Sequence, residues 1–188
     1  MIYESYPWKC DLSKRCETLK KYTHKPIKTD DDYTKVEKAI IYSAFIIRKL
    51  IDCHSKTSDE VDKYVLNVES IPSVEKMDIA NNWIKESTHN WNRATSETIS
   101  AKNMCNQLIH SFVFSIDENE DGTLHGFFVS SDYDRNKKLF SVNISEWINL
   151  IDFVVTDDIV EMRIKYDPAK NERVLIKKQR GIMEVIND

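Results

Sequence analysis

A row of polar side chains in the segment NMCNQLIHSF, residues 103–112, has types and spacing that chemistry could use. Asn106, Gln107 and His110 follow Asn103 at intervals of three, four and seven residues. Because seven residues make almost two full turns of an α-helix, these side chains are predicted to share one helix face. Amides can bind the hydrogen-bonding groups of RNA or protein, and a histidine at a helix end can act as a general acid or bind a phosphate near neutral pH. The same row would also suit the polar side of an ordinary helix.

The helix that carries this row is predicted to extend over residues 95–111, TSETISAKNMCNQLIHS. Its other face carries apolar side chains at spacings of three and four residues, which are Ala101, Met104, Cys105, Leu108 and Phe112. This spacing is typical of an amphipathic helix with one buried face. We therefore expect the polar row to open toward a groove or a second subunit.

The segment CNQLIHS resembles the signature helix of the HEPN superfamily, the higher-eukaryote and prokaryote nucleotide-binding proteins. These are all-α bundles, frequently metal-independent ribonucleases of toxin, CRISPR and antiphage systems, and two motif copies usually face each other in a dimer. Their motif is an arginine, often followed by an asparagine, and then a histidine a few residues later. The resemblance implies that His110 is the catalytic or RNA-contacting histidine and that Asn106 is the polar residue after the arginine. The upstream segment SAFIIRKLID resembles a core helix of such bundles.

The motif arginine itself is missing, because residues 103–105 are Asn, Met and Cys. A guanidinium there would stabilise the negative charge that develops on the phosphate during RNA cleavage. Arg48 or Arg93 could replace it only if the fold brought one of them to the polar row. Arg48 lies within an apolar helix face, so we expect it to reach a carboxylate, a carbonyl or a cleft.

The bulk composition excludes several functional classes. The formal net charge is −4, so any contact with RNA must come from a local patch. The three glycines are too few and too scattered for a phosphate-binding loop, which argues against P-loop NTPases, dinucleotide-binding dehydrogenases and kinases. The four cysteines and five histidines do not cluster at zinc-site spacings, so neither a metal nor a cofactor is expected. Without a signal pattern or a membrane-spanning apolar run, the chain is expected to be cytoplasmic, with no membrane partner.

The first part of the chain is predicted to be mainly helical. A basic amphipathic helix is expected within residues 9–28, with Leu12, Cys16 and Leu19 on its apolar face. The strongest helix covers residues 29–56, where Val36, Ile40, Ser43, Ile47 and Leu50 follow helical spacing and Ile41, Ala44, Phe45 and Ile51 widen the apolar face. A short edge strand is expected in residues 59–72, and another helix in residues 75–87.

From residue 112 the apolar spacing changes to the alternation that is typical of strands. Two strands are predicted around an acidic turn that ends in Asp121-Gly122, which is a hairpin signal, and a third strand in residues 137–144. The segment SSDYDRNKKL, residues 130–139, could bind a cation or a phosphate, or be a solvated turn.

The last part of the chain is predicted to contain a helix and two strands. Ser145 is the expected N-cap of the helix EWINLIDFVV. Strands follow in residues 159–166 and 173–180. In the first of them, alternate side chains are expected to point inward, namely Val160, Met162, Ile164 and Tyr166.

These patterns together predict the α+β class, as a single domain over residues 1–188. A HEPN-like helical part, residues 1–111, is expected to pack with a strand-rich part, residues 112–188, that forms an antiparallel sheet and carries one helix.

In function, the chain is expected to be a component of a prokaryotic defence or toxin-like system, such as antiviral defence or toxin–antitoxin pairs, that acts through RNA or protein binding and assembly. Asn103, Gln107 and Arg48 are the expected residues for binding RNA or a partner, while His110 and Asn106 are the expected catalytic residues. The partner would be a second copy in a homodimer, another protein of the system, or RNA. Two alternatives stay open: a metal-independent RNA endonuclease with His110 as acid or base, and a purely structural scaffold subunit.

Overall fold

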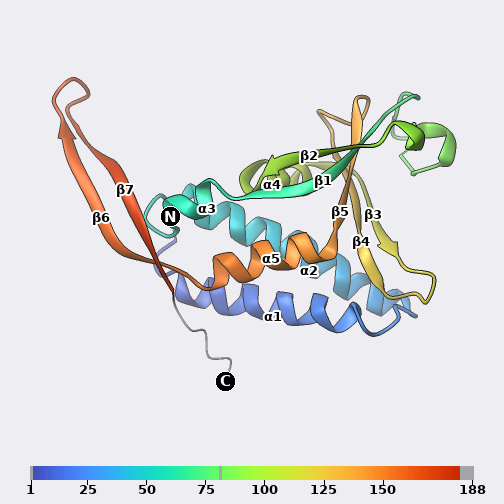
Figure 1. Ribbon diagram of the computed structural model, residues 1–188, viewed down its shortest axis with the longest axis horizontal. Helices are drawn as coiled ribbons and strands as arrows, with labels where there is room; N and C mark the ends of the chain where they lie inside the picture. Colours follow the sequence, from blue (N-terminus) through green and yellow to red (C-terminus); the bar gives the residue numbers. More distant parts are fainter. Residues whose placement is uncertain (1, 81, 183–188) are drawn as a thin grey trace.

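The computed structural model describes residues 2–80 and 82–182, and it places helices, a five-stranded sheet and a separate hairpin in one α+β arrangement (Figure 1). The α-helices are α1 (Tyr6–Tyr22), α2 (Asp30–Asp52), α3 (Asp59–Asp62), α4 (Ala101–Ile109) and α5 (Ile144–Val155). The strands are β1 (Val65–Pro72), β2 (Thr95–Ser100), β3 (Ser111–Glu118), β4 (Leu124–Ser131), β5 (Lys138–Asn143), β6 (Asp157–Asp167) and β7 (Glu172–Ile182), and two short 3₁₀ turns are η1 (Glu86–Thr88) and η2 (Trp91–Arg93). The predicted fold class is confirmed.

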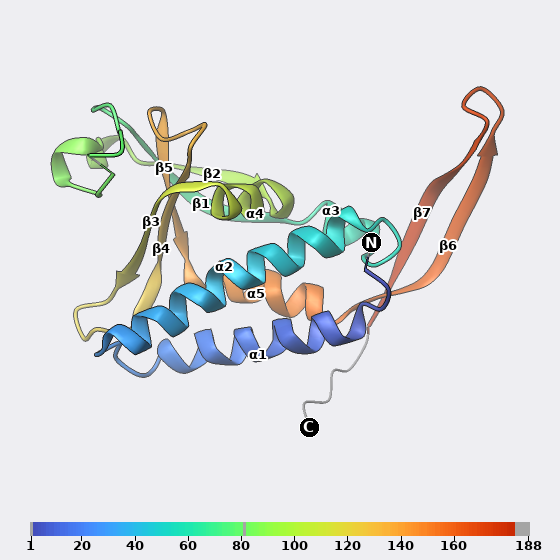
Figure 2. The same ribbon diagram turned by 180° about the vertical axis from the view of Figure 1, so that it is seen from behind.

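Helices α1, α2 and α5 lie along one another and form the helical layer (Figures 1 and 2). The Thr29 side chain caps α2 by accepting a hydrogen bond from the Asp32 amide, and three aspartates fill the first turn, where the helix dipole favours negative charge. The predicted apolar positions of α1 and α2 are buried except on the widened face of α2, where Ile41 is half-buried and Phe45 is 44% exposed. The two long helices are therefore confirmed, with a narrower buried face on α2 than expected.

The sheet has the strand order β2-β1-β5-β4-β3, and every neighbouring pair is antiparallel. One face packs against the helices and supplies the core, with Leu66, Val68, Phe127, Phe140 and Val142 all buried. The predicted hairpin β3–β4 is confirmed, and Gly122 takes the positive φ of 79° that its turn requires. The helix α5 that follows β5 is capped by Asn143, which accepts from the Ser145 amide, so Ser145 is not the N-cap.

Three expected elements differ from the structure. β1 lies between β2 and β5 and is not an edge strand, because residues 95–100 pair with it as β2 and are not helical. Residues 75–87 do not form a helix: within the described part of this segment, only the start of η1 is helical, and Ile79 and Trp83 are 89% and 75% exposed. An apolar pattern makes a helix only when those side chains find a surface to pack on.

The two-stranded sheet β6–β7 projects away from the rest of the molecule (Figures 1 and 2). Both strands were predicted, but the inward direction of the four alternate side chains in β6 was wrong. Val160, Ile164 and Tyr166 are more than half exposed, and Met162 is 39% exposed. No second sheet lies over this ribbon in the described part of the chain, so its apolar side chains have no core to enter.

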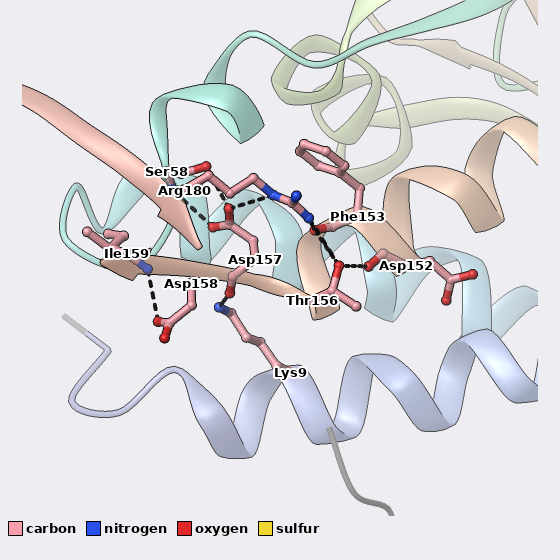
Figure 3. Close-up of polar contacts among 9 residues, drawn as sticks. All are labelled: Lys9, Ser58, Asp152, Phe153, Thr156, Asp157, Asp158, Ile159 and Arg180. Atoms are coloured by element: carbon pink, nitrogen blue, oxygen red, sulfur yellow. Dashed lines mark hydrogen bonds and ion pairs between the residues drawn. The ribbon is translucent and has the colours of Figure 1, made fainter. Parts of the chain in front are cut away.

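Buried charges fix the base of the ribbon to the helical layer (Figure 3). The Asp157 carboxylate accepts hydrogen bonds from the Ser58 amide at 2.9 Å and the Ser58 hydroxyl at 2.6 Å, and pairs with Arg180 Nε at 3.3 Å. Lys9 Nζ donates to the Asp157 carbonyl oxygen, and the Arg180 guanidinium lies over the Phe153 ring at 4.1 Å. Burial raises the pKa of Asp157, while the bonds from Ser58 and the charges of Lys9 and Arg180 oppose that rise.

A second buried contact holds β7 to α3. Lys178, which is 3% exposed, pairs through Nζ with Asp62 at 2.6 Å and with Asp59 at 3.8 Å, both on α3. Its backbone amide also donates to the Asp59 carboxylate. The ribbon therefore leaves the molecule in a direction set by buried ion pairs at its base. None of the described helices is long and apolar enough to cross a membrane.

Candidate functional site

A polar cleft of about 980 Å³ lies beside α4, the helix that connects the two edge strands β2 and β3. Its walls come from residues 97–100 of β2, the polar face of α4, one arginine of α2, and the loop between β4 and β5. A volume of this size accommodates a small ligand or a short stretch of a polymer. Two other clefts of the described residues are smaller, at about 650 and 430 Å³.

All five residues predicted for the site line this cleft: Arg48, Asn103, Asn106, Gln107 and His110. The row forms on α4 because Ser100 caps the helix, accepting from the Asn103 amide, and because Met104, Cys105 and Leu108 bury the opposite face. Asn103 and His110 are exposed, and His110 is the C-cap residue of α4. The row therefore faces an open cleft and not the protein interior.

Arg48 reaches the row from α2. Its Nε donates to the Asn106 side-chain oxygen at 2.8 Å, and its guanidinium pairs with Asp52 one turn along α2. Lys102 adds a second cation at 3.5 Å from the same carboxylate. The hydrogen bond from Arg48 is the main reason that the pKa of Asp52 lies below its usual value. Arg93, in η2, is not among the residues that line the cleft.

Gln107 has a structural part in the cleft wall. Its side-chain oxygen accepts from the Ser131 amide at 2.8 Å, and its side-chain nitrogen donates to Asp134 at 2.7 Å. Both contacts tie α4 to the end of β4 and to the loop that follows. Because Gln107 is largely buried and both ends of its amide are used, it holds the wall and offers little to a ligand.

The charges around the cleft balance one another. Lys138 pairs with Glu97, Arg135 with Asp132 at 2.7 Å, and Lys137 with Asp134 at 3.5 Å. A phosphate backbone would need an excess of cations, and the described residues that line the cleft do not supply one. The free hydrogen-bonding capacity instead comes from amides, hydroxyls and one imidazole, which suits an uncharged polar ligand such as a peptide backbone.

Several cleft residues were missed by sequence reasoning. Residues 97–100 were assigned to the helix, although the β-branched Thr95, Thr98 and Ile99 favour a strand there. Tyr133, 80% exposed, and Lys138 belong to residues 130–139, for which the sequence offered a cation or phosphate site or a solvated turn. Within residues 2–80 and 82–182, no three or more His, Cys, Asp or Glu side chains are grouped so that they could hold a metal ion.

No family model matches the chain, and neither the search of curated proteins nor that of solved structures gave a significant match.

Proposed function

We propose that this chain is a binding and assembly component of a prokaryotic defence or toxin-like system, and that it holds a partner protein in the cleft beside α4. The observation that carries the proposal is the common position of Arg48, Asn103, Asn106 and His110 on one open cleft. Amide and imidazole groups there offer donors and acceptors, and the paired charges leave no phosphate-binding excess. The assignment to a defence or toxin-like system rests on the resemblance of CNQLIHS to the HEPN signature helix.

Site-specific photocrosslinking tests this proposal. A photoreactive amino acid at position 103 would be compared with the same group at exposed His24, in the turn that follows α1. A protein that crosslinks only from position 103 would then be purified and its affinity measured by calorimetry. We expect His110→Ala and Asn103→Ala to weaken binding at least about tenfold, as for loss of contacts in a desolvated interface, with unchanged thermal unfolding.

The control variant His24→Ala should bind like the parent chain. If the two cleft variants bind the purified protein as well as the parent does, the proposed function is wrong. If they unfold at much lower temperature, the row is structural, which favours the scaffold alternative.

A metal-independent RNA endonuclease is the second candidate, and the contact between Arg48 and Asn106 favours it. That contact brings a guanidinium to the helix that carries His110, where the sequence motif lacks one. His110 would exchange a proton with the reacting ribose or leaving oxygen, and Arg48 would stabilise the phosphate charge. Cleavage of labelled RNA in EDTA, lost in both His110→Ala and Arg48→Lys but kept in His24→Ala, would establish this activity.

A further inference from the structure

The outer edge of β2 is open, and the register of the sheet shows which of its backbone groups point outward. The Ala101 amide donates to the Tyr64 carbonyl oxygen at 2.9 Å, which makes Tyr64 and Ala101 a hydrogen-bonded pair of the antiparallel ladder. Hydrogen-bonded pairs alternate in such a ladder, so Leu66–Ile99 and Val68–Glu97 are also bonded pairs. It follows that the N–H and C=O groups of Ser96 and Thr98 point away from β1.

A contact on β1 supports the same assignment. The Asn67 amide, opposite Thr98 in the register, donates to Glu146 on α5 at 2.9 Å and so does not face β2. In the part of the chain that the structure describes, no hydrogen bond reaches the backbone of Thr98 or Ser96 from outside the sheet. Both residues are exposed.

The other edge of the same sheet is protected in a way that β2 is not. β3 carries two register shifts, between Ser111 and Val113 and between Asp117 and Glu118, which interrupt its pairing pattern. β2 pairs with β1 in unbroken register over all six residues and contains no proline and no lysine. A regular, exposed edge of this kind is a template for another extended chain.

The cleft reaches this edge. Residues 97–100 are consecutive, so their side chains alternate between the two faces of the sheet, yet all four line the cleft. Glu97 and Ile99 share one face of the sheet with Phe140 of β5, which also lines the cleft, so the cleft lies over that face and is bordered by β2. An added strand would therefore run along the cleft, and its alternate side chains would point toward the face that Asn103 and His110 share.

We infer that β2 accepts an extended peptide segment of the partner protein as a sixth strand, with polar side chains at alternate positions entering the α4 cleft. An extended backbone can satisfy the outward N–H and C=O of Thr98 together, and backbone pairing gives affinity while the cleft gives specificity. The paired charges of the cleft favour this occupant over RNA. The inference rests on the proposed function and names the form in which the partner binds.

A proline substitution tests the inference without disturbing the sheet. Thr98→Pro removes an outward N–H that β1 does not use, and proline is tolerated at such an edge position. Thr98→Val is the matched control, because it keeps the N–H and the β-branched shape. The probe is a displayed library of random dodecapeptides, selected on the full chain, with the best binder then synthesised.

We expect the selected peptide to bind the parent chain and Thr98→Val alike, and Thr98→Pro at least about tenfold more weakly. N-methylation of alternate peptide amides should abolish binding for one set of positions and not for the other. Slowed hydrogen exchange of the Thr98 amide in the complex would locate the pairing. Circular dichroism would check that Thr98→Pro stays folded.

The outcomes separate the two proposals. If the peptide binds Thr98→Pro normally but is lost in Asn103→Ala and His110→Ala, strand addition is wrong and cleft binding stands. If no peptide is selected, or if the selected peptide binds elsewhere on the chain, strand addition is overturned. If the crosslinked partner is unaffected by the cleft variants, the proposed function fails as well.

Discussion

The contact between Arg48 and Asn106 is the residue-scale link between the long helix α2 and the polar row of α4. Arg48 bonds Asn106 at 2.8 Å and pairs with Asp52, so one side chain satisfies two groups at the cleft wall. Because Asp52 is partly exposed, its ion pair adds little to the free energy of unfolding. What the pair does is hold the guanidinium in place beside the row.

This arrangement makes a prediction about the titration of Asp52. Its pKa lies below the usual value first because of the hydrogen bond from Arg48, and Lys102 adds to the effect. Arg48→Met should therefore raise the pKa of Asp52, measured by NMR of the carboxyl carbon against pH. Lys102→Met should raise it less. An unchanged pKa in Arg48→Met would mean that the pair does not form in solution.

Asp32 and Tyr22 make the free energy of unfolding depend on pH at both extremes. The hydrogen bond from Tyr22 lowers the pKa of Asp32 below 3.8, so its contribution is present above that pH and is lost as the pH falls further. Burial, together with the bond to Asp32, raises the pKa of Tyr22 from 10.0 to about 12, so its contribution is present below pH 10.0 and is lost as the pH rises toward 12.

Tyr22→Phe should flatten both changes, as denaturation midpoints at about pH 3, 7 and 11 would show. A variant that keeps the acid loss of the parent chain would show that another carboxylate is responsible.

The hydrogen bond between Trp147 and Ser43 anchors α5 to α2 inside the core. Trp147 Nε1 donates to Ser43 Oγ at 3.0 Å, and both residues are fully buried. Ser43→Ala leaves that donor without a partner, so the free energy of unfolding, measured in denaturant, should fall by about 1–3 kcal/mol. In a Trp147→Phe background the same substitution should cost less, because no donor is left to satisfy. Equal costs in the two backgrounds would contradict this account.

At the scale of elements, local sequence patterns predicted the helices that bury one apolar face in the core. The apolar spacing in residues 29–56 is local, and α2 follows it. The polar row of α4 was also readable, because Asn103 and His110 lie opposite buried Met104 and Leu108.

Elements whose secondary structure depends on residues far away in the sequence could not be predicted from local patterns. β2 pairs with β1, which lies about 30 residues earlier in the chain. Leu66 and Ile99, for example, are paired at a separation of 33 residues, and no local pattern shows that pairing. Residues 75–87 have a helical pattern, but their place is set by distant contacts such as the Met77 amide donating to Asn136 at 2.8 Å. The contact of Arg48 with Asn106, 58 residues apart, needed the fold as well.

The element-scale prediction concerns the base of the β6–β7 ribbon. Asp157→Ala removes the acceptor of the Ser58 amide and hydroxyl and leaves Arg180 without its carboxylate, in a site where Asp157 is fully buried. Loss of one partner of a buried pair costs about 3–5 kcal/mol, so the variant should unfold at lower denaturant concentration and the ribbon amides should exchange faster. The adjacent Asp158→Ala should change unfolding by less than about 0.5 kcal/mol, because Asp158 is exposed. Similar effects of both variants would show that the buried network does not hold the ribbon.

At the scale of the whole molecule, the β6–β7 ribbon is the part whose presence is least explained by a contribution to the stability of the fold. Its two strands pair mainly with each other and project from the body (Figure 1). Apolar side chains of these strands, such as Ile164 and Ile176, are exposed. A lone two-stranded ribbon is marginally stable in water, yet buried ion pairs at Asp157 and Lys178 fix its direction. The body should therefore fold without the far end of the ribbon.

Shortening the ribbon tests this separation. Met162 pairs with Lys178 in the register, so an Asn-Gly turn can replace residues 163–177 and keep the buried base. We expect the melting temperature of the body to change by less than about 3 °C, because the core cluster contains no residue of the removed segment. Adding Asp157→Ala to the shortened chain should cost about as much as in the full chain, since Ser58 and Arg180, which lose their partner, are both kept. A fall of about 10 °C or more on shortening would instead make the ribbon part of the folding unit, and its exposed apolar side chains would then have to be explained through contacts with the body.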